Sequence, residues 1–565
     1  MNKLPFIEKG HAGPMEFNRK SSGASPLFLW LYVFGIIIFL FIAIIRLFQL
    51  TVVKGTYYAT LAENNRVREV VVEAERGNIY DRKGILLAGS HEGDAENELE
   101  RVISSRMYYK PEATSHIIGY RQTADKNDMK QDPCLNKLKS GDKTGKSGIE
   151  KLFDCDLRGV YGKKLIEVDA SGKYKRTIDF IPPQTGKELR LALDVTLQEK
   201  AQELMKGKKG AVVGVKPDTG EILVLFSSPT FNPQAFEDKD AQLAKAYFSD
   251  ADKPLYNRAI EGVYPPGSTF KPFMVAAGLE EDAITTDTIF EDKGVLKAGE
   301  KEFNNWYYLE YGRTEGDVDV LKALQRSNDT YFYQLGGKLG PEKIKKWAEL
   351  FGFQNKTGIG LNESEGIIPS SFWKEDVLKE QWYLGDTYNL SIGQGYVTTT
   401  PLQVAMGTAA FANGGYLCKP LLLKVGTNEA PKPECKKIPM SRKTYEIVRE
   451  GMKMACETGG TGYPFFGFGI PEATVSAQLA KSGKNSSDSA KLLQVPQKRI
   501  EVGCKTGTAE SHSESGKPHA WFTIFAPLED EEIALTVIVE EGGQGSDEAA
   551  PIAKEILKTY FQRIE

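Results

Sequence analysis

The chain opens with one long apolar stretch and continues as a mixture of polar and apolar segments. Residues 26–45 carry no charge, and Arg46 ends the run. Twenty residues at about 1.5 Å each span the ~30 Å hydrocarbon core of a bilayer. A signal peptide would have a shorter apolar centre and a small-residue cleavage site, and a soluble core helix would keep a polar stripe. We therefore predict a transmembrane anchor over residues 26–46.

The tail before this stretch is basic, with Lys3, Lys9, Arg19 and Lys20 against two acidic residues. Basic flanks remain on the cytoplasmic side of a membrane. We expect residues 1–25 to form a cytoplasmic tail and the chain after residue 46 to lie outside the cytoplasm.

Residues 47–186 are polar and rich in turns. A helical pattern over 50–68 is followed by an alternating strand pattern over 69–74, and Lys- and Gly-rich loops occupy much of the remainder. This pattern predicts a mostly β pedestal without a large core of its own. Pro182 and Pro183 open a linker that ends at Gly186.

Residues 187–565 have strand patterns near both ends and helical patterns between them. The expected strands cover 189–193, 210–215, 221–227, 521–525 and 533–539, and a last helix covers 549–562. A Pro-Asp-Thr-Gly turn at 217–220 indicates a hairpin. We predict one α+β domain whose sheet is closed by pairing the two ends of this segment.

Composition narrows the function only slightly. A chain of 565 residues favours two or three domains, and a net charge of −4 argues against nucleic-acid binding driven by bulk charge. The histidines lack metal-ligand spacing, and they are His11, His91, His116, His512 and His519. We expect neither a metal nor a cofactor.

The six cysteines form no Cys-x-x-Cys motif. An exported chain permits disulfides. Cys134–Cys155 and Cys418–Cys435 are possible local pairs, which would leave Cys456 and Cys504 as a long-range pair. Six unpaired thiols are the alternative, because the sequence does not determine connectivity.

The segment Tyr264-Pro-Pro-Gly-Ser-Thr-Phe-Lys271 carries the first candidate chemistry. A spacing of three places Ser268 and Lys271 on one helical face, and Pro-Pro-Gly indicates a helix start just before them. Positive potential at a helix N-terminus disfavours an ammonium on Lys271, so its amine can accept the serine proton. The same potential stabilises negative charge that develops when Ser268 attacks a carbonyl.

Spacing alone does not select this site. S-x-x-K also occurs at Ser140–Lys143 and Ser371–Lys374. K-T-G occurs at 143–145, 356–358 and 505–507. Only the last copy lies between strand patterns, where an edge strand could pair with an extended peptide.

A third element, Ser327-Asn328-Asp329, precedes a helical pattern over 330–339. Ser, Asn and Asp are all good helix N-caps, so a structural role for these residues is the competing interpretation.

In this order the three elements resemble the S-x-x-K, S-x-N and K-T-G set of penicillin-binding proteins and serine β-lactamases. Further segments resemble class B penicillin-binding proteins, and among them the elongation type, penicillin-binding protein 2. These are Arg76–Ala88, Gly148–Lys151, Asn257–Ala259, Tyr264–Lys271, Ser327–Tyr333, Gly385–Gly395, Thr400–Gln403, His519–Phe522 and Ala549–Ala553. The resemblance runs from the anchor to the C-terminus.

The resemblance implies a fold and an activity. It implies a transpeptidase domain over 187–565 with a central antiparallel sheet flanked by helices, on a pedestal over 47–186 of the kind called a dimerisation domain. Ser268 would attack the penultimate D-Ala carbonyl of a peptidoglycan stem peptide and release D-Ala through an acyl-enzyme. The chain would be a single-pass protein of the bacterial inner membrane with its catalytic domain outside the cytoplasm.

The resemblance also implies roles for the site residues. Lys271 would be the base for acylation, and Ser327 and Lys505 would relay the proton to the leaving amine and hold the substrate carboxylate. Asp329, Thr506, Gly507 and Thr508 would bind substrate, with the N–H groups of Ser268 and Thr508 forming the oxyanion hole. β-Lactams would be covalent inhibitors, and a membrane-embedded glycan polymerase of the shape, elongation, division and sporulation family would be the partner.

Two positions depart from the family pattern. Asp329 replaces the asparagine of S-x-N, and Cys504 stands where glycine commonly precedes the K-T-G lysine. Three other functions remain as alternatives: a class D β-lactamase-like hydrolase, a non-catalytic sensor or scaffold, and a D,D-carboxypeptidase that uses water as acceptor. A bifunctional class A enzyme would need an extra glycosyltransferase domain, for which the segment between anchor and linker is too short.

Overall fold

The computed structural model describes residues 26–91, 104–169, 171–428, 430–471, 497–511, 513, 515–530 and 532–562. The predicted cytoplasmic tail, residues 1–25, lies outside them. The described chain forms two compact units. One unit contains residues 26–70 and 163–181, and the other contains residues 71–162 and 182–562 where these are described.

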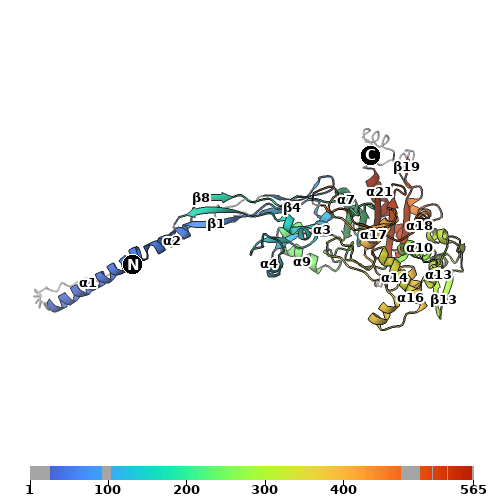
Figure 1. The fold of residues 1–565 in the computed structure, drawn as a ribbon, viewed down its shortest axis with the longest axis horizontal. Helices are drawn as coiled ribbons and strands as arrows, with labels where there is room; N and C mark the ends of the chain where they lie inside the picture. Colours follow the sequence, from blue (N-terminus) through green and yellow to red (C-terminus); the bar gives the residue numbers. More distant parts are fainter. Residues whose placement is uncertain are drawn as a thin grey trace, which may run out of the picture. The chain divides into compact units, whose positions relative to one another are not determined.

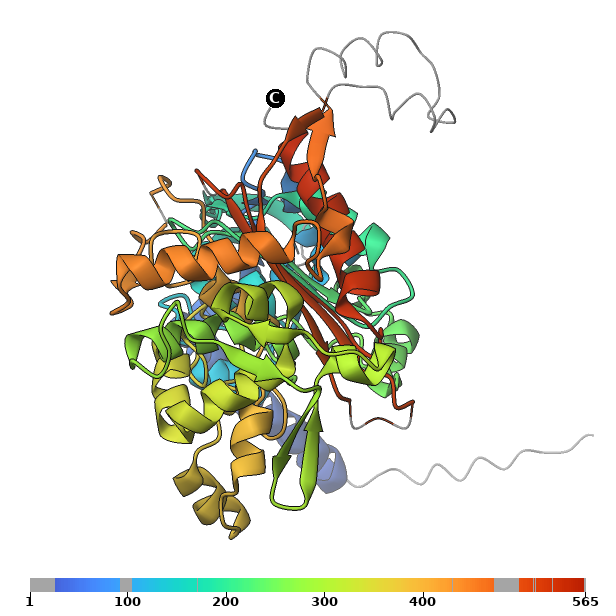
Figure 2. The same cartoon turned by 90° about the vertical axis from the view of Figure 1, so that its right-hand side faces the viewer.

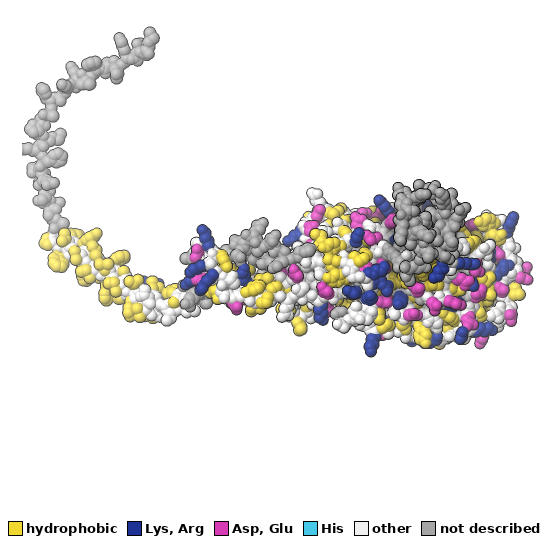
Figure 3. Space-filling model, turned by 90° about the horizontal axis from the view of Figure 1, so that it is seen from above, with side chains coloured by type: hydrophobic (Ala, Val, Ile, Leu, Met, Phe, Trp, Pro, Cys, Tyr) yellow, Lys and Arg dark blue, Asp and Glu magenta, His cyan; other side chains and the backbone are white. Residues whose placement is uncertain are grey.

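The first unit begins with the apolar helix α1 (Pro26–Phe48), which continues through a π-helical turn, η1 (Gln49–Val53). Its 18-residue window reaches a mean hydropathy of 2.9, and none of these side chains is buried. Figure 3 shows that hydrophobic side chains cover this helix. Within the described residues it is the one helix long and apolar enough to cross a membrane.

After α1, the first unit continues as a helix and a small sheet. Helix α2 (Gly55–Arg66) leads into β1 (Val67–Val72), which pairs with β7 (Gly162–Val168), and β7 pairs with β8 (Tyr174–Ile181). The core of this sheet consists of Val70, Ile166 and Val168. This core is small, whereas apolar residues from 71–162 of the predicted pedestal belong to the core of the second unit.

Residues 71–162 add short strands and helices to the second unit. They are β2 (Ile79–Tyr80), β3 (Leu86–His91), β4 (Ser105–Tyr108), α3 (Pro111–Ile118), β5 (Arg121–Thr123), α4 (Lys126–Gln131), β6 (Lys143–Gly145), α5 (Gly148–Leu152) and α6 (Asp154–Leu157). Strand β2 pairs in parallel with β9 (Leu189–Arg190). Apolar side chains such as Ile79 and Ile149 belong to the same core as the C-terminal part.

Buried ion pairs also stabilise this segment. Glu150 is wholly buried and accepts hydrogen bonds from Arg76 and Arg106. Glu237, on the short helix α8 (Gln234–Glu237), accepts two hydrogen bonds from the Arg121 guanidinium. Because a buried charge is costly without a partner, the Arg121–Glu237 pair links residues 71–162 to the segment that follows, whereas the Glu150 pairs hold residues 71–162 together.

The main sheet has five strands in the order β11-β10-β22-β21-β20. Their bounds are β10 (Gly210–Val215), β11 (Ile222–Ser228), β20 (Gly503–Ala509), β21 (His519–Ala526) and β22 (Ile533–Val539). All neighbours are antiparallel. Pairing of β10 with β22 joins the two ends of the segment, as predicted, and Figure 2 shows these strands side by side.

Both faces of the sheet are buried because its side chains alternate between two cores. Val212, Phe522 and Val537 belong to one core, which helices α7 (Val195–Leu204) and α21 (Ala550–Phe561) complete. Val213, Trp521 and Ile538 belong to the other, with α10 (Lys271–Glu280) and α17 (Pro401–Ala410). The sheet therefore lies between layers of helices (Figure 1).

The middle of the chain is mostly helical. Its helices include α9 (Ala241–Ser249), η2 (Gly267–Phe270), α11 (Trp306–Tyr311), α12 (Val320–Arg326), α13 (Asp329–Leu339), α14 (Pro341–Leu350), α15 (Ser371–Trp373), η3 (Lys374–Leu378), α16 (Leu384–Ser391), α18 (Arg442–Ala455) and η4 (Tyr463–Phe465). A π-helical turn, η5 (Gly545–Ala549), directly precedes α21 near the C-terminus. Two-stranded ribbons pair β12 (Phe290–Asp292) with β15 (Gly316–Val318), β13 (Val295–Ala298) with β14 (Lys301–Asn304), β16 (Tyr416–Cys418) with β17 (Cys435–Lys437), and β18 (Gly469–Pro471) with β19 (Gln497–Arg499).

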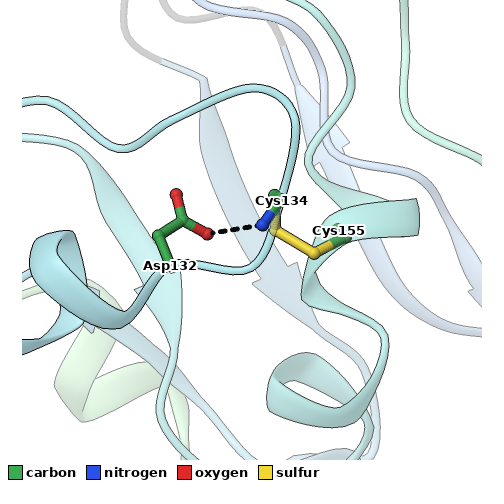
Figure 4. A group of neighbouring side chains, drawn as sticks. All are labelled: Asp132, Cys134 and Cys155. Atoms are coloured by element: carbon green, nitrogen blue, oxygen red, sulfur yellow. Dashed lines mark hydrogen bonds between the residues drawn. A yellow bond between two sulfur atoms is a disulfide. The ribbon is translucent and has the colours of Figure 1, made fainter.

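All six cysteines are paired, and the pairs are the three that the sequence permitted: Cys134–Cys155, Cys418–Cys435 and Cys456–Cys504. Near the first pair, Asp132 accepts hydrogen bonds from the N–H groups of Cys134 and Leu138 (Figure 4). Asp132, Cys134 and Cys155 are the one group among the described residues that could hold a metal ion by proximity. Both thiols are consumed in the disulfide, so this group offers a single carboxylate and does not fit a metal.

Candidate active site

Ser268 lies in the 3-10 turn η2, which runs directly into α10. The sequence predicted Ser268 in the first turn of the helix, and the structure places it in the tighter turn immediately before. Gly267 has a φ of +55°, and a Cβ there would meet the Thr508 carbonyl oxygen at 2.9 Å. Glycine is therefore required for η2 to approach β20 so closely.

Lys271 begins α10, and its side chain is wholly buried. Its Nζ donates to the carboxylate Oδ1 of Asp329 at 2.6 Å and to the backbone carbonyl of Ser327 at 2.7 Å. The Ser327 Oγ is 3.3 Å away. Within the described residues, the Ser268 hydroxyl has no hydrogen-bond partner. The amine of Lys271 points toward the Ser327-Asn328-Asp329 motif, because its hydrogen bonds go to Ser327 and Asp329.

Lys505 extends from strand β20 of the main sheet to the same hydroxyl, Ser327 Oγ. It is wholly buried, and its Nζ donates to Ser327 Oγ at 2.8 Å and to the Thr506 carbonyl at 3.0 Å. Strand β20 is the outer strand of the sheet, as the sequence predicted. Ser327 Oγ is therefore in contact with both lysine amines, which come from motifs 234 residues apart along the chain.

The cluster holds two lysines and one carboxylate, and both lysine pKa values are lowered. Burial lowers the pKa of Lys271 below 10.5, although Asp329 opposes this shift. Burial and the nearby charge of Lys271 hold the pKa of Lys505 well below 10.5, again against Asp329. A neutral amine in this cluster is the form that can accept a proton.

The turn between α12 and α13 explains how Ser327 and Asp329 enter the site. Asn328 caps α13, because its side-chain oxygen accepts from the Tyr331 N–H. The capping interpretation is thus correct for Asn328 alone. Ser327 has a φ of +54°, a left-handed conformation that costs a non-glycine residue about 1–2 kcal/mol. Such strain is typical of functional positions.

The other K-T-G residues make close contacts beside β20. Thr506 Oγ1 is 2.7 Å from Thr461 Oγ1. Thr508 Oγ1 donates to Gln544 Oε1 at 2.9 Å. Gly507 has no room for a side chain, because a Cβ would lie 2.9 Å from both Thr269 Cγ2 and Trp521 Cβ.

Several residues that support the site were not singled out from the sequence. Asn305 accepts from the Asp329 N–H, and the Trp306 N–H donates to Asp329 Oδ2 at 3.0 Å. Gln394 donates to the Thr508 carbonyl at 3.2 Å. Gln394 lies in the segment Gly385–Gly395 that resembles the family, but no local pattern connects it or Asn305 with the motifs.

The other S-x-x-K and K-T-G copies do not join this cluster. Lys374 pairs with Asp386 at 2.8 Å. Lys143 pairs with Glu237 at 2.7 Å. Lys356 lies in a loop beside a surface cavity of about 640 Å³ that also contains the Cys418–Cys435 disulfide.

Comparison with known proteins identifies the family. The family model of the penicillin-binding protein transpeptidase domain matches residues 210–558, and that of the penicillin-binding protein dimerisation domain matches residues 100–191. The chain belongs to the class B penicillin-binding proteins. This confirms the resemblance on which the sequence interpretation depended.

Within this family the chain is most like penicillin-binding protein 2. It is 30% identical to the peptidoglycan D,D-transpeptidase MrdA of Haemophilus influenzae, over 94% of this chain and 90% of that protein. The structure is similar to penicillin-binding protein 2 of Helicobacter pylori in complex with MreC, with a TM-score of 0.71, 27% identity, and coverage of 88% and 100%.

It is also similar to a chain of a peptidoglycan synthase complex that coordinates polymerization and crosslinking. The TM-score is 0.70 and the identity 25%, with 96% of this chain and 99% of that chain covered. The predicted fold class, a transpeptidase domain with a central antiparallel sheet and one N-terminal apolar helix, is therefore confirmed.

Proposed function

We propose that this penicillin-binding protein cross-links peptidoglycan stem peptides as a serine D,D-transpeptidase with Ser268 as its nucleophile. The observation that carries the proposal is the convergence of three distant motifs. Lys271 and Lys505 both contact Ser327 Oγ, and η2 brings Ser268 against the backbone of β20. Burial lowers the pKa of both lysines, which favours the neutral amine that acylation requires.

In the acylation step, the Ser268 Oγ attacks the penultimate D-Ala carbonyl while Lys271 accepts the hydroxyl proton. The N–H groups of Ser268 and Thr508 stabilise the oxyanion. The peptide C–N bond then breaks, and the terminal D-Ala leaves with a proton relayed through Ser327. The outcome is an ester between Ser268 and the shortened stem peptide.

In the second step, an amine from a neighbouring stem peptide attacks the ester and regenerates the Ser268 hydroxyl. Before acylation, Lys505, Thr506 and Thr508 hold the carboxylate of the terminal D-Ala, and its negative charge favours the ammonium form of Lys505 on binding. The hydrogen bond to Asp329 holds the side chain of Lys271 beside Ser327. A β-lactam carries a reactive carbonyl and a carboxylate, so it acylates Ser268 and blocks the site.

The proposed topology follows the anchor. Residues 1–25 remain in the cytoplasm, residues 26–46 cross the inner membrane once, residues 47–186 form the pedestal, and residues 187–565 perform the reaction outside. The apolar α1 helix supports this topology. Similarity to a chain of a synthase complex supports a membrane-embedded glycan polymerase of the shape, elongation, division and sporulation family as partner.

Labelling with a fluorescent penicillin, followed by peptide mapping, tests the nucleophile. We expect the acyl group on the peptide that contains Ser268, and no labelling of Ser268→Ala. Ser371→Ala is the matched control, because Ser371 belongs to another S-x-x-K match and should leave labelling unchanged. An acyl group on any other serine would overturn the assignment.

A product assay tests the acceptor. Purified enzyme in detergent receives a lipid-linked glycan polymer with pentapeptide stems, and the products are digested and separated. Cross-linked dimers support a transpeptidase. Free tetrapeptide without dimers would show that water is the acceptor and would assign a carboxypeptidase.

A further inference from the structure

Cys504, the residue before Lys505, forms a disulfide with a residue outside the main sheet. Cys504 lies in β20 and is wholly buried, and its disulfide partner Cys456 caps the C-terminus of α18. Helix α18 packs against β20. The bridge therefore ties the strand that carries Lys505 to a neighbouring helix.

A second contact from the same loop lies two residues further along the strand. Thr461 Oγ1 is 2.7 Å from Thr506 Oγ1. Side chains alternate along a strand, so Cys504 and Thr506 lie on one face of β20 and Lys505 on the other. The loop after α18 thus holds the strand at both positions that flank Lys505.

Gly462 shows how closely this loop follows the bridge. A Cβ at Gly462 would lie 2.7 Å from Cys504 Sγ and 3.3 Å from Cys456 Sγ. Its N–H donates to the Ala455 carbonyl at 2.8 Å, so the loop turns back onto the end of α18. We call the segment 456–462, with its bonds to Cys504 and Thr506, the β20 clamp.

The position of β20 explains why a clamp is useful. Within the described residues, β20 has one strand neighbour, β21, and its other edge pairs with no strand. Residues 457–502, 46 in number, separate Cys456 from β20, so α18 does not fix the strand through a short connection. The Cys456–Cys504 disulfide joins the two ends of this segment and therefore restricts β20 independently of the conformation of the segment.

We propose that the β20 clamp is a positioning element for the reaction: it fixes the Lys505 amine against Ser327 Oγ and so sets recognition of the substrate carboxylate. This inference depends on the proposed role of Lys505. Both cysteines of the Cys456–Cys504 bridge are buried. Cys456, Thr461 and Cys504 act through Lys505 and do not contact substrate.

The carboxylate supplies a test that separates positioning from stability. The acylation rate constant is measured for benzylpenicillin and for its methyl ester, which lacks the carboxylate charge, together with the thermal midpoint. In Cys456→Ala/Cys504→Ala we expect acylation by the acid to fall about tenfold, less than the ~10² attributed to a 1 Å misplacement. Acylation by the ester should be unchanged, so the preference for the acid falls about tenfold.

Two sets of variants control this result. Cys418→Ala/Cys435→Ala removes another disulfide, whose sulfurs contact the carbonyl oxygens of Pro217 and Asp218, and should retain the wild-type preference. Cys456→Ala and Cys504→Ala alone should each equal the double variant, because either one abolishes the bond.

A milder variant serves if the disulfide variants do not fold. Thr461→Val removes only the hydrogen bond to Thr506 and should reduce the preference for the acid about threefold, the effect expected of one net hydrogen bond of ~0.7 kcal/mol. Thr461→Ser keeps the hydroxyl and should restore it.

The two proposals fail in different ways. If the wild-type enzyme is not acylated at Ser268, the proposed function is wrong. If the wild-type enzyme is acylated normally and the clamp variants lower the thermal midpoint but keep the wild-type preference for the acid, the clamp is only structural and this inference is overturned.

Discussion

Two S-x-x-K motifs in this chain each place a buried lysine three residues after a serine, yet the pKa values of these two lysines are shifted in opposite directions. Lys374 is almost wholly buried, and burial alone would lower its pKa. A hydrogen bond from Lys374 to Asp386 and the nearby Glu380 outweigh this effect, so its pKa is raised. Lys271 also has a carboxylate partner, Asp329, but its pKa is lowered by complete burial.

The difference lies in what surrounds each ammonium. Lys374 lies close to two carboxylates near the surface, which stabilise its charge. Lys271 is wholly buried, and its amine shares a hydrogen-bond partner, the Ser327 hydroxyl, with a second lysine, Lys505. Complete burial is thus the feature that distinguishes Lys271, and the charge of Lys271 in turn lowers the pKa of Lys505.

The largest effect should distinguish the two lysines directly. Lys271→Ala removes the proposed base, so acylation by penicillin should fall about 10²- to 10⁴-fold, the usual contribution of general base catalysis. Lys374→Ala should leave the acylation rate unchanged, because Lys374 lies in a separate ion pair. Stopped-flow measurement of acylation checks both variants. Equal losses would mean that the burial of Lys271 is irrelevant.

The next effect concerns the approach of Ser268 to β20. Gly267→Ala should lower the acylation rate about 10²-fold, because its methyl group forces the Thr508 carbonyl away. Gly299→Ala is the control, since Gly299 has a φ of +64° but no atom near its Cβ position. Gly299→Ala should lose less stability in thermal denaturation and should keep the wild-type acylation rate, because its methyl group meets no other atom. An unchanged acylation rate in Gly267→Ala would show that the close contact is dispensable.

A smaller effect is a shift of pH dependence. Asp329 raises the pKa of Lys271 against the effect of burial, so Asp329→Asn should lower that pKa further. The base must be neutral to act, and the acidic limb of the acylation rate should therefore move to lower pH. A pH series of the acylation rate measures this limb. A shift to higher pH would contradict the assignment of the limb to Lys271.

The smallest effect is expected at the other motif. Asp386→Asn removes a carboxylate that raises the pKa of Lys374. The acidic limb of the acylation rate should keep its wild-type position, measured in the same pH series. A shift in this variant would mean that Lys374 is electrostatically coupled to the reaction.

Much of the fold follows from local patterns. The predicted strands 210–215 and 533–539 have the same bounds as β10 and β22, because continuous apolar runs specify strands buried on both faces. The apolar helix α1 extends two residues beyond the predicted anchor end at Arg46. The prediction for Ser327-Asn328-Asp329 was less accurate, since a cap signal does not say which of three residues caps.

The site itself combines local and distant information. The sequence by itself determined the apolar anchor, the buried strands and the spacing of Ser268 and Lys271, because each depends on the chemistry of neighbouring residues. Only the tertiary structure decided which lysine has a lowered pKa. Burial of Lys271, its contact with Asp329, and the meeting with Lys505 all arise from residues dozens to hundreds of positions apart, whose distances no local pattern encodes.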